Sequence, residues 1–105
     1  MPTNEELYQE HDRLKAAGQL AEAATVLEQL VAQDPSYTLA HSALAVLYGK
    51  LNRHAEAIRN GLKVCELEPK DPFSFTAMSV TFQRAGKIPE AEDAMARART
   101  LQAGG

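Results

Sequence analysis

The sequence predicts an all-α protein in which three helix-turn-helix units form a stack. The main observation is a repeat with an interval of 34 positions, shared by two prolines, three turn residues and three Glu-Ala pairs. These are Pro35 and Pro69; Gly18, Asn52 and Gly86; and Glu22-Ala23, Glu56-Ala57 and Glu90-Ala91. A unit of this length is too small to bury its own apolar face, so neighbouring units must pack against one another.

The chain contains six amphipathic segments, and each is expected to form a helix. Their expected ranges are residues 4–17, 20–33, 38–51, 54–67, 72–85 and 88–101. Gly18, Asn52 and Gly86 end the first helix of each pair, because Gly and Asn best tolerate the left-handed conformation that follows a helix. The sequence shows no alternating pattern typical of a strand.

Prolines mark the boundaries of the other helices. Pro35 and Pro69 end the second helices of the first two pairs, because the residue before a proline is disfavoured in the helical region. Asp71 and Pro72 supply an N-cap side chain and a proline in the first turn of the fifth helix. Pro89 is expected to do the same near the start of the sixth helix.

The composition is that of an ordinary globular domain. Hydrophobic residues make up 45% of the 105 positions and charged residues 24%. The formal net charge of −3 gives no support to nucleic-acid binding, and no apolar run approaches the ~20 residues of a membrane span. The polar residues 1–10 do not have the pattern of a signal peptide. The single cysteine, Cys65, favours a reducing compartment, so a cytoplasmic location is expected.

The spacing resembles that of the tetratricopeptide repeat family, whose units have small residues at the eighth and twentieth places and a proline near the close. Here the eighth place is Ala45 and Ser79 in the second and third units, and the twentieth is Ala23, Ala57 and Ala91. The resemblance covers one domain, residues 4–105, with repeats at 4–37, 38–71 and 72–105. It implies an α-solenoid of six antiparallel helices, in a right-handed superhelical stack with a concave groove.

Small side chains are expected to set the distance between neighbouring helices. Ala23, Ala57 and Ala91 allow close approach of the adjacent helix. Gly61 departs from the family pattern, in which a larger side chain is usual. We expect either Tyr48 or a partner's side chain to fill the gap, or the helix to be locally weak.

The two ends of the stack are expected to be polar. Glu10 and His11 in the first repeat, and Glu92 and Arg99 in the last, occupy places where other repeats carry small or apolar side chains. Polar groups there suit terminal repeats, which have no neighbour on their outer side.

Candidate catalytic and metal-binding groups are few. His11, His41 and His54 lie on different helices or at a turn, and none has a Cys or His neighbour at metal-ligand spacing. The sequence has no glycine-rich phosphate loop, nucleophile elbow or H-E-x-x-H stretch. We therefore expect no catalytic residue, no metal site and no cofactor.

The resemblance also implies where a partner binds, because the first helices of tetratricopeptide arrays line the concave face. The residues assigned to partner binding are Tyr8, Asp12, Leu39, Ser42, Val46, Phe73, Thr76, Val80, Gln83 and Arg84. An apolar stripe on a face open to water usually marks a contact site. The stripe within this set is Leu39, Val46, Phe73 and Val80. The alternative is that neighbouring helices cover some of these side chains and the stripe supports the fold.

Some family members hold the acidic C-terminus of a large chaperone with Lys, Arg and Asn side chains on this face. The resemblance places those positions at Tyr8, Asp12, Ala43, Phe73 and Ala77, and none of these residues is such a donor. Asp12 would also repel a carboxylate. No clamp of this kind is expected.

The sequence thus favours a non-catalytic interaction module or scaffold with a protein or peptide partner. The expected ligand is an apolar or amphipathic segment, extended or helical, laid in the groove. The alternative is a structural subunit whose same apolar face pairs with another copy, as a homo-oligomer, or with a fixed subunit of a larger assembly.

Overall fold

The structure, a computed structural model, describes residues 1–104. Within these residues the chain forms six α-helices and no strand, as predicted. The helices are α1 (Asn4–Ala16), α2 (Leu20–Gln33), α3 (Thr38–Lys50), α4 (His54–Leu67), α5 (Pro72–Arg84) and α6 (Ile88–Gln102). Each observed boundary lies within one residue of the predicted range, because local turn chemistry sets these boundaries.

The turn residues have the conformations that their chemistry favours. Gly18, Asn52 and Gly86 have φ angles of 77°, 60° and 76°, in the left-handed region. Asp71 is the N-cap of α5, where its Oδ1 accepts a hydrogen bond from the Phe73 N–H at 3.0 Å. These contacts confirm how the sequence ends the first helix of each pair and begins the fifth helix.

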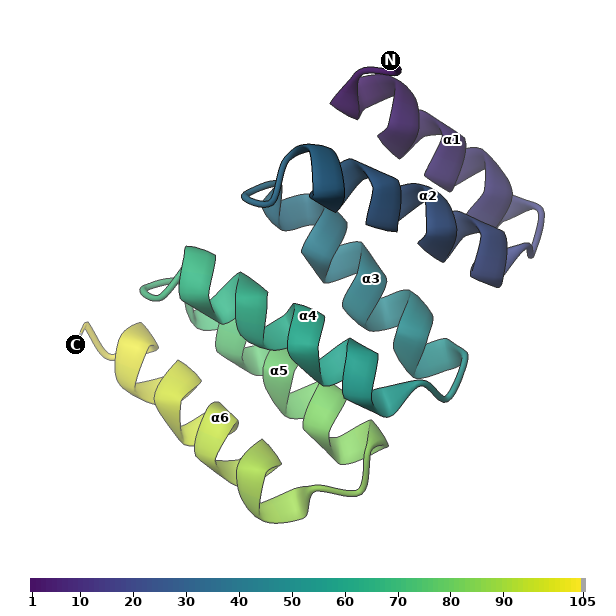
Figure 1. Cartoon of the computed structure of the whole chain (residues 1–105). Coiled ribbons are helices and arrows are strands. Elements are labelled where there is room, and N and C mark those ends of the chain that lie inside the picture. The colour runs from purple at the N-terminus through teal and green to yellow at the C-terminus, as the bar shows by residue number, and fades with distance from the viewer. Residues whose placement is uncertain (105) are drawn as a thin grey trace.

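The helices form three hairpins that stack side by side. Figure 1 shows α2 in front of α3 and α4 in front of α5, with the N- and C-termini at opposite ends of the stack. Helices adjacent in sequence pack on one another, and the molecule measures 41 × 26 × 20 Å. The first helices α3 and α5 therefore run in the same direction, on either side of α4 and behind it in this view.

Two apolar clusters hold the stack together. The larger one contains residues from the first four helices, α1, α2, α3 and α4. It includes Leu27, Leu30, Leu44 and Leu47, all at most 1% exposed. The smaller one joins the second and third hairpins around Cys65, Met78 and Ala94, with Ile58, Phe75 and Phe82 partly buried beside it. Ala23, Ala57 and Ala91 are at most 2% exposed, which fits their predicted role in close helix approach.

His11 corrects the expectation of a polar outer face on the first repeat. Its side chain is only 1% exposed, and its ring lies 4.9 Å from the Tyr8 ring. The eighth position of the repeat lies between the helices and not at the solvent-exposed surface, as it also does in the other two repeats. Burial lowers the pKa of His11, and its Nε2 has no hydrogen-bond partner among residues 1–104. Glu92 and Arg99, at the other end, are exposed as expected.

Gly61 is explained by a residue that the sequence did not suggest. A Cβ added at Gly61 would lie 2.7 Å from Met78 Sδ, so the thioether of α5 occupies the space beside α4. Met78 is 2% exposed. The expectation that Tyr48 fills this gap is therefore wrong, because a residue of the next repeat fills it.

Candidate functional site: an apolar trough between α3 and α5

The apolar stripe is open to solvent along its whole length. The exposed fractions of Leu39 and Val46 on α3 are 60% and 45%, and those of Phe73 and Val80 on α5 are 74% and 40%. On each helix the two residues are seven positions apart, so they lie on one face two turns apart. These four large apolar side chains therefore do not belong to the core.

Two hollows lie between the halves of this stripe. The first, of about 460 Å³, is lined by residues that include Leu39 and Phe73, and the second, of about 300 Å³, by residues that include Val46 and Val80. The hollows share the lining residues Ser42, Val64, Ser74 and Ala77. They are therefore parts of one continuous depression, which we call the trough.

The walls of the trough come from α3 and α5, and part of its floor comes from α4. Gly61 and Val64 reach it from α4, where Val64 is 8% exposed. Small side chains at Ser74 and Ala77 leave the depression open between the helices. The packing of Met78 against Gly61 lets α5 lie close to α4 and sets the depth of the second hollow.

The trough brings together six of the ten residues assigned to partner binding. These six are Leu39, Ser42, Val46, Phe73, Val80 and Arg84. Tyr8 and Asp12 lie on α1 and line neither hollow; the Tyr8 ring is half-buried against Tyr37, 6.1 Å away. Gln83 lines a separate hollow of about 670 Å³ together with Arg99 of α6. Thr76 donates its hydroxyl to the Pro72 carbonyl at 3.1 Å.

The floor of the trough contains residues that the sequence assignment missed. Gly61 and Val64 lie on a second helix, whereas the assignment took only first helices. Ser74, Ala77 and Met78 lie on α5 but are not among the ten residues assigned to partner binding. The sequence signal for these floor residues was the glycine at position 61, where the family pattern has a larger side chain. An unexpectedly small residue marks a place where two segments approach closely.

Opposite charges stand at the two ends of the trough. Glu68 and Asp71 line the first hollow, beside the start of α5. Arg84 lines the second hollow, at the end of α5, and its Nη1 lies 3.6 Å from the point where a Cβ of Gly49 would be. Its guanidinium therefore reaches across toward α3.

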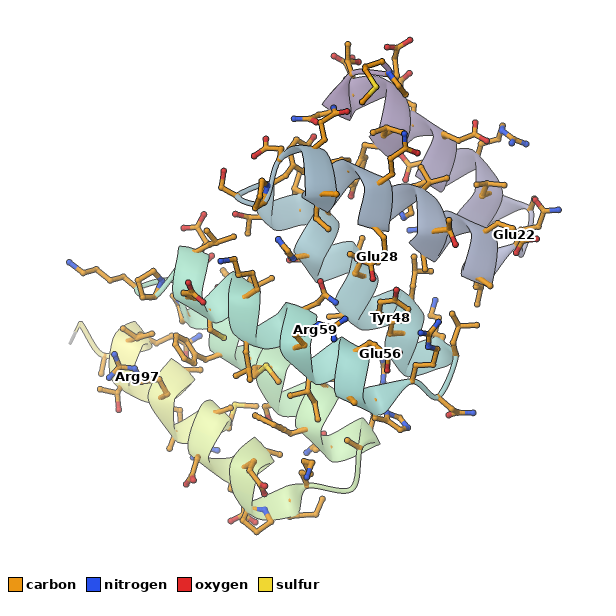
Figure 2. The ribbon with its side chains drawn as sticks, viewed as in Figure 1. Glu22, Glu28, Tyr48, Glu56, Arg59 and Arg97 are labelled. Atoms are coloured by element: carbon orange, nitrogen blue, oxygen red, sulfur yellow. The ribbon has the colours of Figure 1, made fainter. Side chains whose placement is uncertain are left out.

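The opposite face of the stack carries a polar link between the first two repeats. The Tyr48 hydroxyl of α3 donates a hydrogen bond to Glu28 of α2 at 2.5 Å, and Figure 2 shows these two side chains near Glu56 and Arg59 of α4. Burial and then the hydrogen bond to Glu28 raise the pKa of Tyr48 to about 12. The Arg53 guanidinium lies 4.8 Å from the centroid of the Tyr48 ring and bonds to Glu56. This cluster holds α2, α3 and α4 in register.

Within residues 1–104, no three His, Cys, Asp or Glu side chains are grouped so that they could hold a metal ion. Cys65 is buried, and burial raises the pKa of its thiol. The thiol donates to the Ser74 carbonyl at 3.5 Å, as a packing residue between α4 and α5.

Comparison with known proteins agrees with this architecture. Residues 14–59 match the family model described as tetratricopeptide repeat. Among curated protein sequences, none matches significantly. Among solved structures, MamA has a TM-score of 0.87 at 18% identity, over 97% of this chain and 60% of the MamA chain. YrrB, described as a TPR protein with an unusual peptide-binding site, has a TM-score of 0.86 at 20% identity, over 97% of this chain and 53% of its own.

A third solved structure covers nearly the same length as this chain. It is the second TPR of Spaghetti (RPAP3) bound to an HSP90 peptide, with a TM-score of 0.82 at 17% identity, over 94% of this chain and 92% of that one. By contrast, this chain spans only about 60% of MamA.

The fold is that of an α-solenoid, a class of protein in which repeated helical hairpins stack and expose an extended concave surface. Residues 14–59 match the tetratricopeptide repeat model, and the chain shares its fold with solved structures that are described as TPR proteins. None of its helices over residues 1–104 combines the length and apolarity that crossing a membrane requires.

Proposed function

We propose that this protein is a non-catalytic interaction module that binds an apolar or amphipathic segment of a partner protein in the trough. The observation that carries the proposal is the exposed apolar stripe with a continuous depression between its two halves. Side chains of a partner can enter the depression, while the rims of Leu39 and Phe73 cover them from water. The apolar surface thus supplies most of the affinity.

Phe73 is the main anchor in this proposal. It is the aromatic residue of the stripe and its most exposed member, at 74%, and it lines the larger of the two hollows. Aromatic side chains near the centre of a contact surface commonly account for ~2 kcal/mol or more of binding. The remaining assigned residues, including Tyr8, Asp12, Thr76 and Gln83, would contact a ligand that extends beyond the trough.

The partner is proposed to differ from the HSP90 peptide SRMEEVD that is bound to the second TPR of RPAP3. The places that would need Lys, Arg or Asn donors are Tyr8, Asp12, Ala43, Phe73 and Ala77. An exposed carboxylate at Asp12 and an exposed ring at Phe73 favour an apolar segment over a terminal carboxylate.

We also propose that repeats at 4–37, 38–71 and 72–105 form one domain, and that it acts in the cytoplasm, where the Cys65 thiol stays reduced.

Binding to short peptides tests the proposal directly. A phage-displayed library of random short peptides is panned against the purified protein, and the enriched sequences are synthesised with a fluorescent label. Their affinities for the parent protein and for Phe73→Ala are measured by fluorescence anisotropy. Phe73→Ala should weaken binding at least about tenfold. Its melting temperature should stay close to that of the parent, because the ring has few core neighbours.

Leu62→Ala is the matched control. Leu62 is an apolar residue of α4 that is 49% exposed and lines hollows outside the trough, so its loss should leave peptide affinity unchanged. Selected peptides that bind Phe73→Ala as tightly as the parent would refute the proposal. Light scattering is run in parallel: a dimer that Phe73→Ala dissociates would instead assign the stripe to self-association, as in a homo-oligomer.

A further inference from the structure

The trough has an acidic end, an uncharged middle and a basic end. Glu68 and Asp71 line the hollow beside Phe73, and Arg84 lines the hollow beside Val80. Every other residue that lines the two hollows is uncharged. A ligand that fills the trough therefore meets opposite charges at its two ends.

The basic end is poised to bind an anion. Within residues 1–104, Arg84 forms no ion pair, although its side chain lies along Gly49 of α3 at 3.6–3.8 Å from the point where a Cβ would be. A guanidinium presents a planar set of N–H donors that matches a carboxylate with two parallel hydrogen bonds. Contact with α3 limits the positions of this side chain and keeps it over the end of the hollow.

The acidic end is poised to bind a cation. Asp71 uses Oδ1 to cap α5, at 3.0 Å from the Phe73 N–H, so Oδ2 remains open. Glu68 is exposed and lines the same hollow, and none of the ion pairs within residues 1–104 involves either carboxylate. Two carboxylates at one rim attract a Lys or Arg side chain and repel an acidic one.

The length of the trough suits a short extended ligand. Cα atoms of α3 and α5 lie within 8 Å of each other at their closest, so a ligand lies along the trough and not between the two helices. Phe73 and Arg84 are separated along α5 by about 16 Å, at 1.5 Å per residue. An extended chain covers this span in about five residues, at ~3.3 Å each.

We propose that the trough binds an extended segment of about five residues with a basic side chain at one end, apolar side chains in the middle and an acidic side chain at the other end. This rests on the proposed function, because it names the ligand of the same trough. The basic side chain pairs with Glu68 and Asp71, and the acidic side chain pairs with Arg84. The charges set the position of the segment, while the apolar stripe holds its middle.

Charge reversal at Arg84 tests this pairing with the peptides selected above. The enriched peptides should share an acidic and a basic residue flanking an apolar stretch. Arg84→Glu should weaken their binding at least about tenfold. Replacing the acidic residue of the peptide by Lys should restore binding to Arg84→Glu and weaken binding to the parent.

Arg59→Glu is the control for net charge. Arg59 is an exposed residue of α4 on the face turned to the viewer in Figure 2, away from the trough, and its reversal changes the net charge by the same amount. Circular dichroism verifies that both variants remain helical. Arg59→Glu should bind every selected peptide as the parent does.

Two results would overturn the inference in distinguishable ways. If Phe73→Ala abolishes binding while Arg84→Glu behaves like Arg59→Glu, the trough binds peptides without regard to the charges at its ends, and the proposed function stands. If Phe73→Ala has no effect on any selected peptide, the peptides bind elsewhere, and both the inference and the proposed function fail.

Discussion

The substitution Gly61→Ala tests the packing between the second and third repeats. A Cβ at this buried position of α4 would lie 2.7 Å from Met78 Sδ and 3.4 Å from Met78 Cε. Non-bonded heavy atoms are most stable at about 3.5–4.0 Å, so the Met78 side chain would have to shift. Because Met78 is only 2% exposed, a shift pushes it against the small cluster around Cys65 and Ala94.

Two opposing effects decide the sign of the change in stability. Replacing Gly by Ala inside a helix stabilises it by about 1 kcal/mol, because Gly loses more backbone freedom on folding. Overpacking a well-filled site costs about 1–3 kcal/mol. The expected net result is a loss of about 1 kcal/mol, and a melting temperature lower by about 4–8 °C for a domain of this size.

Gly49→Ala supplies a control of identical chemistry. Gly49 lies inside α3, and a Cβ there would meet only Arg84, at 3.6 and 3.8 Å, which is ordinary van der Waals contact with a flexible side chain. Gly49→Ala should therefore raise the free energy of unfolding by about 1 kcal/mol. Thermal and urea denaturation, followed by circular dichroism, measure both variants.

A double-mutant cycle then attributes the effect to Met78. With Met78 shortened by Met78→Ala, the clash disappears, and Gly61→Ala should become stabilising in that background. The reasoning is refuted if Gly61→Ala raises the melting temperature of the parent as Gly49→Ala does, because the core would then accept the extra methyl group without strain.

Two further predictions concern polar groups. Burial lowers the pKa of His11 below its ordinary value of 6.5, so protonation of this side chain favours the unfolded chain. The melting temperature should therefore fall as the pH drops below about 6.5, before the exposed carboxylates titrate. His11→Gln should reduce this fall. A parent whose melting temperature is constant between neutral pH and the onset of carboxylate titration would contradict this. Tyr48→Phe removes the hydroxyl that donates to Glu28 and should lower the free energy of unfolding by about 1–2 kcal/mol in urea denaturation. An unchanged urea midpoint would show that water replaces this hydrogen bond without loss.

Local chemistry explains why the helices were predictable. Gly18, Asn52 and Gly86 end their helices through a backbone conformation that depends on the residue itself. Asp71 and Pro72 begin α5 through contacts within the first turn. Such interactions are complete within a few residues, so the sequence contains all the information that they need.

The surroundings of residues that lie between two packed helices were harder to predict from the sequence. His11 was expected at a polar outer face, but it is buried because its place on α1 turns between the helices. Gly61 was recognised as unusual, yet its partner Met78 is 17 positions further along the chain and belongs to the next repeat. The residue type alone does not show which distant side chain will occupy the space beside it.

Some features of the candidate site were also predictable from the sequence, and others required the tertiary structure. The resemblance to tetratricopeptide repeats assigned Leu39, Val46, Phe73 and Val80 to one face, and the structure shows all four exposed. The sequence also predicted the helical boundaries and the stacking of hairpins, because periodicity and turn chemistry are properties of short segments. The tertiary structure alone decided that α4 forms part of the floor of the trough and that Tyr8 lies outside it. It also placed Glu68 and Arg84 at opposite ends, because these relations depend on how closely helices from different repeats approach.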